Sequence, residues 1–192
     1  MKLVTDCTEV YTRLKEIQSI YTTKSKEDKH EQTNRGAITQ MLTVLDLYTG
    51  FAFTKDPKFV LNSNMLLWML DGVSFAFMSH SKRYNHLTTY QSFTLEEFRN
   101  KGYRTAMFNE TLKWMKERDI PRYRNFCTKY SFPYWSSRGL KYQGVSKSGQ
   151  FFSLTDINTM EPVLDERQRK KLSVVFDHPL TYNEYVIRIK GE

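Results

Sequence analysis

The spacing of apolar residues predicts a set of consecutive strands near the middle of the chain. Met65–Leu70 is an unbroken apolar run of strand length, and Val73–Met78 alternates with period two. Asp71-Gly72 between them is typical of a hairpin turn. A polar turn then leads into His86–Thr94, which predicts a third strand. Short connections between these runs indicate an antiparallel meander.

Helical spacing of apolar residues dominates the stretches on either side of this meander. The pattern predicts an amphipathic helix from about Tyr103 to Glu117, and Pro121 is expected to prevent its continuation. Before the meander, one helix is expected from a cap at Thr5 or Asp6 to about Ile20. A second is expected over Ala37–Leu47, with Gly50 as a stop.

The remaining segments carry weaker patterns. The polar, mixed-charge run Lys24–Arg35 predicts a solvated loop, and Phe51–Val60 predicts a short strand or loop. Towards the C-terminus we expect a strand at Arg122–Lys129, a short helix within Ser131–Tyr142, paired strands at Leu140–Val145 and Phe151–Thr155, a charged helix at Asp165–Leu172 and a late strand at Tyr185–Ile189.

Composition narrows the class of protein. The 192 residues are 40% hydrophobic, which is enough for a sizeable core, and the longest apolar run is too short to span a bilayer. The N-terminus lacks the long apolar segment of a secretory signal, and only two cysteines occur, so we expect a cytoplasmic protein without disulfides or membrane contact. No His/Cys cluster has the spacing of zinc ligands, so no metal is expected.

The strand-to-helix connection after Thr94 carries the most informative chemistry. Arg99, Lys101, Gly102 and Arg104 place positive charge and a glycine just before the predicted helix. The first N–H groups of a helix lack internal partners and attract anions, and a glycine lets a phosphate approach the backbone. The segment therefore predicts a phosphate-binding turn, although an ordinary turn with solvated basic residues has the same composition.

This connection resembles the signature of the GCN5-related N-acetyltransferase superfamily, Gln/Arg-x-x-Gly-x-Gly/Ala after a strand. Arg99 matches its first position and Gly102 its second, whereas Arg104 stands where Gly or Ala is expected. The resemblance covers roughly Met65 to Leu154. It implies an α/β (α+β) acetyltransferase-like fold, with a central, mostly antiparallel mixed sheet flanked by helices on both faces.

The resemblance also implies a cofactor, acetyl-CoA or another acyl-CoA. Backbone amides of the turn would hold its pyrophosphate, and the strand edge would bind its pantetheine arm. The cofactor-binding residues implied are Phe93, Thr94, Leu95, Arg99, Asn100, Lys101, Gly102, Tyr103, Arg104 and Thr105.

Three side chains are candidates for proton transfer. The family usually takes its base from the strand before the signature, where His86 lies, and Glu97 is a further candidate. The family often uses a tyrosine of a later Tyr-x-x-x-Gly-Phe motif as general acid. Here Trp135 occupies that position ahead of Gly139, so Tyr134, one residue earlier, is the candidate acid.

Function and domain organisation follow from the same resemblance. We expect an acyl-CoA-dependent N-acyltransferase that moves an acetyl group to an amine, formed by residues 1–158, with residues 159–192 as an extension packed on the same domain. The net charge of +8 and the basic, aromatic segment 122–126 leave open a nucleic-acid partner and a DNA-base modification enzyme on this fold. A catalytically degenerate binding or inhibitory protein is the third alternative, because of Arg104 and Trp135.

Overall fold

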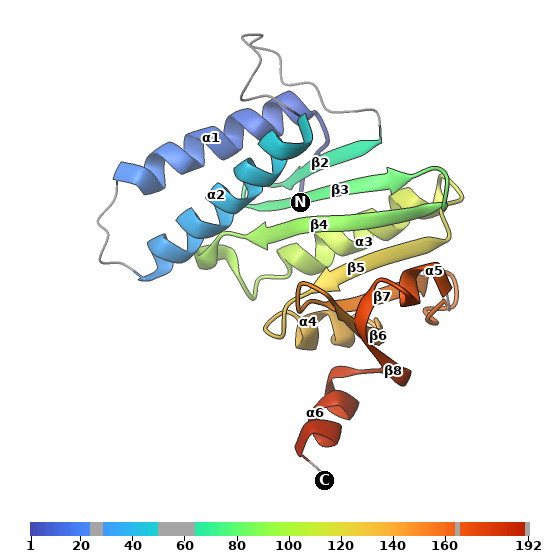
Figure 1. The fold of residues 1–192 in the computed structure, drawn as a ribbon. Helices are drawn as coiled ribbons and strands as arrows, with labels where there is room; N and C mark the ends of the chain where they lie inside the picture. The colour runs from blue at the N-terminus through green and yellow to red at the C-terminus, as the bar shows by residue number, and fades with distance from the viewer. Residues whose placement is uncertain (24–28, 50–63, 164–165, 191–192) are drawn as a thin grey trace. The chain divides into compact units, whose positions relative to one another are not determined.

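The computed structural model describes residues 1–23, 29–49, 64–163 and 166–190 (Figure 1). The helical elements are α1 (Cys7–Thr23), α2 (Lys29–Thr49), the 3-10 turn η2 (Glu96–Phe98), α3 (Tyr103–Lys116), α4 (Phe132–Ser137), α5 (Glu166–Arg169) and α6 (Tyr182–Lys190). The strands are β1 (Leu3–Val4), β2 (Met65–Leu70), β3 (Ser74–Ser81), β4 (His86–Thr94), β5 (Arg122–Cys127), β6 (Tyr142–Ser146), β7 (Phe151–Asp156) and β8 (Leu172–Leu180).

The strands form an eight-stranded sheet in the order β1-β2-β3-β4-β5-β7-β6-β8. Strands β4 and β5 run parallel, with His86–Thr89 beside Arg122–Asn125. The other pairings described, β1–β2, β2–β3, β5–β7, β6–β7 and β6–β8, are antiparallel. The predicted α/β class with a mostly antiparallel mixed sheet is therefore confirmed.

The chain divides into two compact units, and each is described by itself. Unit 1 consists of residues 1–80 and 90–114, and unit 2 of residues 81–89 and 115–192. Strand β4 contributes its first four residues to unit 2 and its last five to unit 1. A domain boundary at residue 158 stays a prediction.

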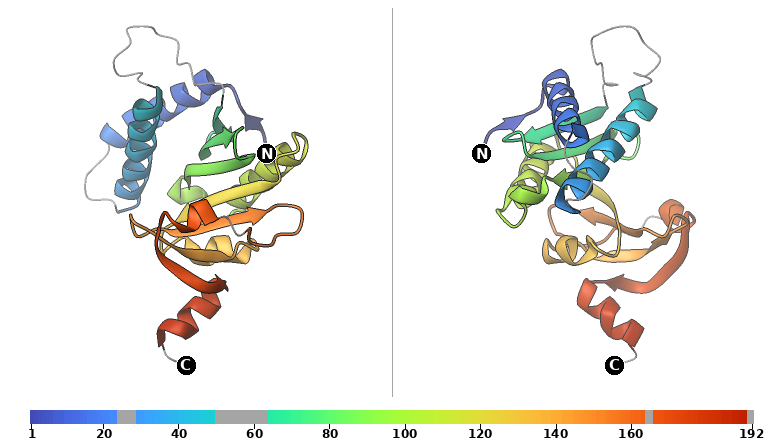
Figure 2. Two further views of the ribbon diagram at one scale, coloured as in Figure 1. Left: turned by 45° about the vertical axis from the view of Figure 1, so that its right-hand side comes forward. Right: turned by 90° about the vertical axis from the view of Figure 1, so that its left-hand side faces the viewer.

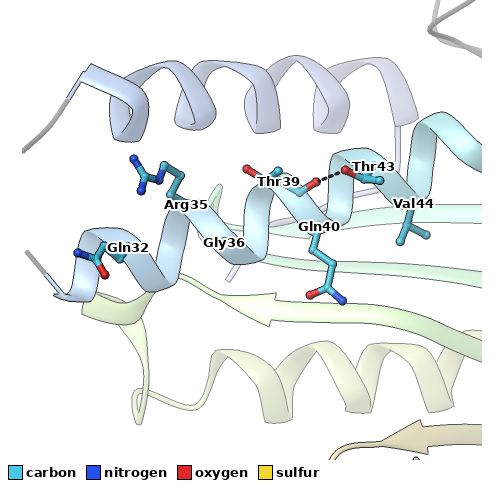
Figure 3. A pocket seen from close by; sticks show the side chains of 7 residues that line it. All are labelled: Gln32, Arg35, Gly36, Thr39, Gln40, Thr43 and Val44. Carbon is cyan, nitrogen blue, oxygen red and sulfur yellow. Dashed lines mark hydrogen bonds between the residues drawn. The ribbon is translucent and has the colours of Figure 1, made fainter. Parts of the chain in front are cut away.

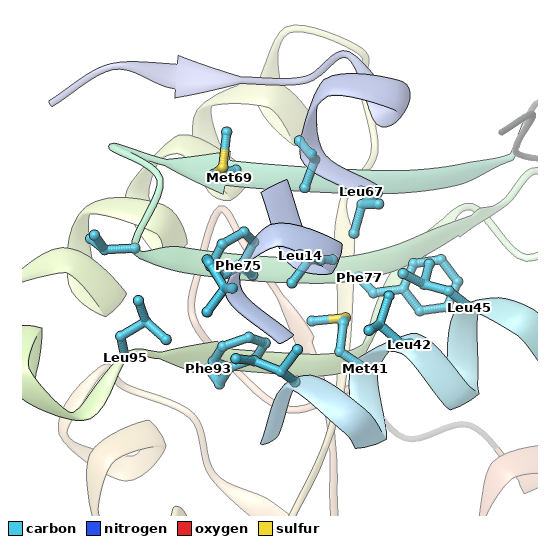
Figure 4. Close-up of a cluster of buried hydrophobic side chains, with 14 of the residues drawn as sticks. Leu14, Met41, Leu42, Leu45, Leu67, Met69, Phe75, Phe77, Phe93 and Leu95 are labelled. Carbon is cyan, nitrogen blue, oxygen red and sulfur yellow. The ribbon is translucent and has the colours of Figure 1, made fainter. Parts of the chain in front are cut away.

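In unit 1 the alternation of side chains along the strands creates an apolar face under α1 and α2. Leu67, Met69 and Phe75 are buried on this face together with Leu14 of α1 and Met41 of α2 (Figure 4). The two helices lie side by side (Figure 2). Burying one such side chain stabilises a fold by about 1.5–3 kcal/mol, so this cluster contributes strongly to the stability of unit 1.

The opposite face of the same strands packs against α3. Trp68, the neighbour of Leu67, meets Trp114 edge-on with ring centroids 5.8 Å apart. Thr111 of α3 is buried as well, because its hydroxyl donates to the Met107 carbonyl within the helix at 2.8 Å. Unit 1 thus has helices on both faces of its strands, as the sequence predicts.

The N-terminal helices confirm one expectation and correct another. The Asp6 carboxylate caps α1 by accepting from the Glu9 amide at 2.8 Å. The predicted loop Lys24–Arg35 is wrong from Lys29 onward, because α2 begins there. Its first turns are polar yet anchored, since the Asn34 side chain is buried. Residues 24–28, Gly50 and the expected strand or loop Phe51–Val60 lie outside the described residues.

Unit 2 has an aromatic core around α4. Phe132 is fully buried, with its ring centroid 4.4 Å from that of Tyr142 and 4.5 Å from that of Phe151. Two tyrosines of α6, Tyr182 and Tyr185, complete the cluster at 5.5 and 5.6 Å. Aromatic pairs in such geometry contribute beyond the area they bury, which explains how a short α4 is held in place.

The predicted late strand Tyr185–Ile189 is wrong, because these residues belong to α6. The helix starts with a capping box: the Thr181 amide donates to the Glu184 carboxylate at 2.6 Å, and the Glu184 amide donates back to the Thr181 hydroxyl at 3.4 Å. The hydroxyl and amide of Thr181 lower the pKa of Glu184 from its ordinary value. The late strand is instead β8, and the predicted charged helix at 165–172 is limited to α5.

Candidate cofactor-binding site

Successive residues at the end of β4 direct their backbone N–H and C=O groups towards opposite edges of the strand. The Leu95 amide donates to the Val73 carbonyl at 2.9 Å, on the side of β3. Because successive residues of a strand direct their backbone groups to opposite edges, those of Thr94 face the other way. The Arg99 side chain confirms this direction, since its Nε donates to the Thr94 carbonyl at 3.3 Å. Of the predicted strand residues, Thr94 therefore has its backbone groups turned away from β3.

The turn that follows has the backbone of an anion site. Asn100 and Gly102 have φ values of 60° and 83°, a region that asparagine tolerates and glycine enters freely. A Cβ on Gly102 would meet no atom within 4 Å, so its flank is open. The Ala106 amide donates to the Gly102 carbonyl at 2.9 Å and begins the helical ladder. The amides of Tyr103, Arg104 and Thr105 therefore lie before the first hydrogen bond of the α3 helix.

The charges around this turn favour an anion. The first turn of α3 contains no acidic residue, although acidic residues are the usual companions of a helix N-terminus. Arg104 is instead half-buried there. Arg99 pairs with Glu96, and the exposed Lys101 places its ammonium 5.1 Å from the centre of the Phe98 ring. A bound phosphate would supply the negative charge that this helix start lacks.

A partly buried polar network that the sequence did not predict supports η2 just before the turn; its Tyr21 and Asn34 side chains are buried, whereas Glu97 is exposed. The Asn34 side chain, 2% exposed, accepts from the Glu96 amide at 2.7 Å and donates to the Glu97 carboxylate at 2.9 Å. The Tyr21 hydroxyl donates to the other oxygen of that carboxylate at 2.7 Å and accepts from Asn34 at 3.0 Å. The network links α1, α2 and η2.

The three candidate proton-transfer residues fall in different surroundings. Glu97 belongs to unit 1, where Tyr21 and Asn34 hold its carboxylate. His86 belongs to unit 2 and is 2% exposed, with its ring stacked on Tyr84 at 6.0 Å. Their catalytic roles stay predictions.

Tyr134, the candidate acid, lies on α4 in unit 2. Its half-buried ring stands edge-on to Trp135 at 5.0 Å, and the Arg138 guanidinium lies 5.9 Å from its centre. Trp135 is itself 4% exposed and belongs to the core. The one-residue difference from the family motif thus puts the indole in the core, whereas the neighbouring phenol is half-buried.

A groove of about 640 Å³ runs along one face of α2 (Figure 3). Its lining residues recur about one helical turn apart along α2, and they are Gln32, Arg35, Gly36, Thr39, Gln40, Thr43 and Val44. Val44 also packs against the apolar cluster. The side-chain Oε1 of Gln40 accepts from the Gln91 side-chain Nε2 of β4 at 3.2 Å, so the groove adjoins the strand that leads to the turn.

Two other kinds of feature were sought in the described parts of the chain. No group of three or more His, Cys, Asp or Glu side chains there would hold a metal ion. None of the helices there is both long and apolar enough to cross a bilayer.

No protein-family model and no curated protein matches this sequence. Among solved structures, the PaiA N-acetyltransferase of Thermoplasma acidophilum, solved with coenzyme A, is 15% identical with a TM-score of 0.52, covering 81% of this chain and 98% of that one. The ribosomal-protein-S18-alanine N-acetyltransferase of Escherichia coli is 10% identical with a TM-score of 0.49, covering 86% and 96%. The likeness to the Thermoplasma acidophilum structure shows that the chain has the acetyltransferase-like fold that the sequence resemblance implies.

Proposed function

We propose that this protein is an acyl-CoA-dependent N-acyltransferase that transfers an acetyl group to an amine. The observation that carries the proposal is the turn at Gly102. There the first backbone amides of α3 precede the first hydrogen bond of the helix, basic side chains lie beside them, and the first helical turn has no acidic residue. Such a helix start binds phosphate through its N–H groups. The coenzyme A in the Thermoplasma acidophilum relative is the ligand of that protein, and its fold is shared here.

Each part of the site has a role in this proposal. The amides from about Asn100 to Thr105 bind the pyrophosphate, with Arg99, Lys101 and Arg104 adding positive charge. The outward backbone groups of Thr94 bind the pantetheine arm, so the strand residues assigned to this contact are narrowed from Phe93–Leu95 to Thr94. Acyl-CoA supplies the thioester, a reactive acyl donor.

The proposed chemistry is acyl transfer from sulfur to nitrogen. The amine nitrogen forms a bond to the acyl carbon, the carbon–sulfur bond breaks, and the proton lost by nitrogen passes to a base. We assign this base role to His86 or Glu97, and we assign protonation of the leaving thiolate to Tyr134. Holding the two reactants in one geometry accounts for much of the acceleration in such a reaction.

Purified protein tests the proposal directly. Mass spectrometry of the native preparation should detect a co-purified acyl-CoA, calorimetry should show saturable acetyl-CoA binding, and a panel of amines should release free coenzyme A thiol. A protein that binds acetyl-CoA but releases no thiol with any amine would favour the degenerate binding or inhibitory protein. Absence of binding would exclude both the cofactor and the enzyme.

A second candidate function, contact with nucleic acid in a DNA-modification reaction, is favoured by an uneven distribution of charge. Unit 2 holds sixteen Lys and Arg against nine Asp and Glu, a net charge of +7, whereas unit 1 holds thirteen against twelve. The Arg83 and Arg167 guanidinium groups lie 5.3 and 5.2 Å from the centre of the Tyr84 ring. By contrast, Tyr123 of the predicted basic segment is 1% exposed and is not available for stacking on bases.

We expect duplex DNA to bind unit 2 through this Tyr84 cluster, with an affinity that falls steeply as salt rises. Phosphate contacts release counterions, so each neutralised phosphate contributes a slope of about −0.9 to log K against log salt. Arg83→Gln should weaken binding and reduce the magnitude of the slope by about 0.9, the contribution of one phosphate contact. Fluorescence anisotropy over a salt series measures both. Binding that ignores salt, or no binding at low salt, would reject this function.

A further inference from the structure

The groove along α2 has the size and position of a second substrate site. Its volume of about 640 Å³ lies within the range of small-molecule pockets, about 300–1,000 Å³. The groove is open at Gly36, since a Cβ there would meet nothing within 4 Å. The contact between Gln40 and Gln91 joins it to β4, three residues before Thr94. An acyl group on an arm that runs along β4 from the turn towards Gln91 would reach this groove.

The charge of the groove selects the kind of ligand. Arg35 is its one charged lining residue among those described, and no lining residue described is acidic. Arg35 is half-buried, and no hydrogen bond or ion pair of its guanidinium occurs within the described parts of the chain. The guanidinium of an arginine fits a carboxylate or phosphate through two parallel hydrogen bonds.

We propose that this groove binds a small amine acceptor that carries a carboxylate or phosphate group, and that Arg35 binds that group. The inference rests on the proposed acyltransferase function and adds the class of acceptor. The amide of Gln32 and the hydroxyl of Thr39 line the groove beside Arg35 and provide neutral hydrogen-bonding groups for the rest of the ligand (Figure 3). The acceptor amine is then oriented with its anionic end at Arg35 and its nitrogen towards β4.

Matched pairs of amines test the inference. Thiol release from acetyl-CoA is measured with 4-aminobutyrate against butylamine, and with O-phosphoethanolamine against ethanolamine. The anionic member of at least one pair should have the higher kcat/KM by about ten-fold or more, since one charge-assisted contact is worth that much. The two pairs distinguish a carboxylate from a phosphate. A preference for the neutral members, or for spermidine, would overturn the inference.

Substitution of Arg35 gives the second measurement. Arg35→Gln should raise KM for the preferred anionic amine by about ten-fold or more, and Arg35→Lys should recover part of the loss. The acetyl-CoA dissociation constant should stay unchanged, which separates this site from the turn. Lys15→Gln, which removes an exposed charge from α1, is the control and should have no effect. Equal KM values in wild type and Arg35→Gln would also overturn the inference.

A binding measurement separates this inference from the proposed function. The ¹⁵Nε signal of Arg35, assigned by its loss in Arg35→Gln, should shift on addition of 4-aminobutyrate or O-phosphoethanolamine. If that shift saturates while no amine releases thiol, the anion site stands and the acyltransferase function fails. If thiol is released but neither probe shifts the signal, the function stands and this inference fails. If neither occurs, both fail.

Discussion

Gly102→Asp is expected to weaken acetyl-CoA binding at least about ten-fold. The substitution places a carboxylate and a Cβ beside the amides proposed to hold the pyrophosphate. Losing one charge-assisted hydrogen bond costs about 1.5–3 kcal/mol, and about 1.4 kcal/mol corresponds to a factor of ten in affinity. Because the flank of Gly102 is open, the side chain fits without a clash and the folded state is retained. Calorimetry on wild type and variant measures the change.

The chain offers a matched control for the backbone strain of this variant. Gly149, in the turn between β6 and β7, has a φ of 76°, and a Cβ there also meets nothing within 4 Å. Gly149→Asp carries the same charge and a similar strain, about 1–2 kcal/mol for a side chain in this region. It should leave acetyl-CoA affinity unchanged. Equal affinities of folded Gly102→Asp and wild type would remove the cofactor from this turn.

Asn34→Leu is expected to lower the free energy of unfolding by about 1–3 kcal/mol. Leucine has a similar size but removes the acceptor of the Glu96 amide and one donor to the Glu97 carboxylate. The Glu96 amide would be left without its acceptor in a half-buried segment, which costs about 1–3 kcal/mol, whereas the exposed Glu97 carboxylate keeps Tyr21 and solvent as partners. Urea unfolding of the variant measures the loss. Asn109→Leu, on an exposed position of α3, is the control and should change stability by less than about 0.5 kcal/mol.

Asn34→Asp tests the same network through charge. The new carboxylate replaces a donor 2.9 Å from a Glu97 oxygen, so two negative groups would face each other. The variant should therefore be least stable at neutral pH and should recover relative to wild type as acid protonates one carboxylate. Adding Glu97→Gln should restore part of its stability. A variant as stable as wild type at every pH would show that Asn34 and Glu97 are not coupled.

Local patterns in the sequence predicted the centre of the fold well. The bounds of β2 and β4 agree with the predicted runs, and Asp71 and Gly72 have the positive φ values of the predicted hairpin turn. These elements carry their own signals, because strand alternation and turn chemistry depend on neighbouring residues. The N-terminal part of α2 carries no apolar repeat, and the buried side chain among those described there is the polar Asn34. The mixed charge of that segment is typical of a loop, which is why the sequence predicted one there.

The candidate site likewise has one part that the sequence predicted and another that it could not. The glycine, the basic residues and the helix start of the turn are consecutive in the chain, so their arrangement was predictable. The network behind it joins Glu97 to Tyr21, 76 residues away, and to Asn34, 63 residues away. Contacts over such separations leave no trace in a single sequence. The α2 groove could not be predicted either, because nothing in the polar sequence around Arg35 indicates that this arginine is half-buried in the folded chain.

The division of β4 between the two units limits how segments of the gene could be recombined. Residues 86–89 pair with β5 inside unit 2, whereas residues 90–94 belong to unit 1. A fragment ending at residue 114 would take the partner of β5 with it and leave an open strand edge on the remainder. No single cut releases both units complete. Gene fusion or recombination at a unit boundary would thus transfer an incomplete unit, so the two units are expected to be exchanged and duplicated only together.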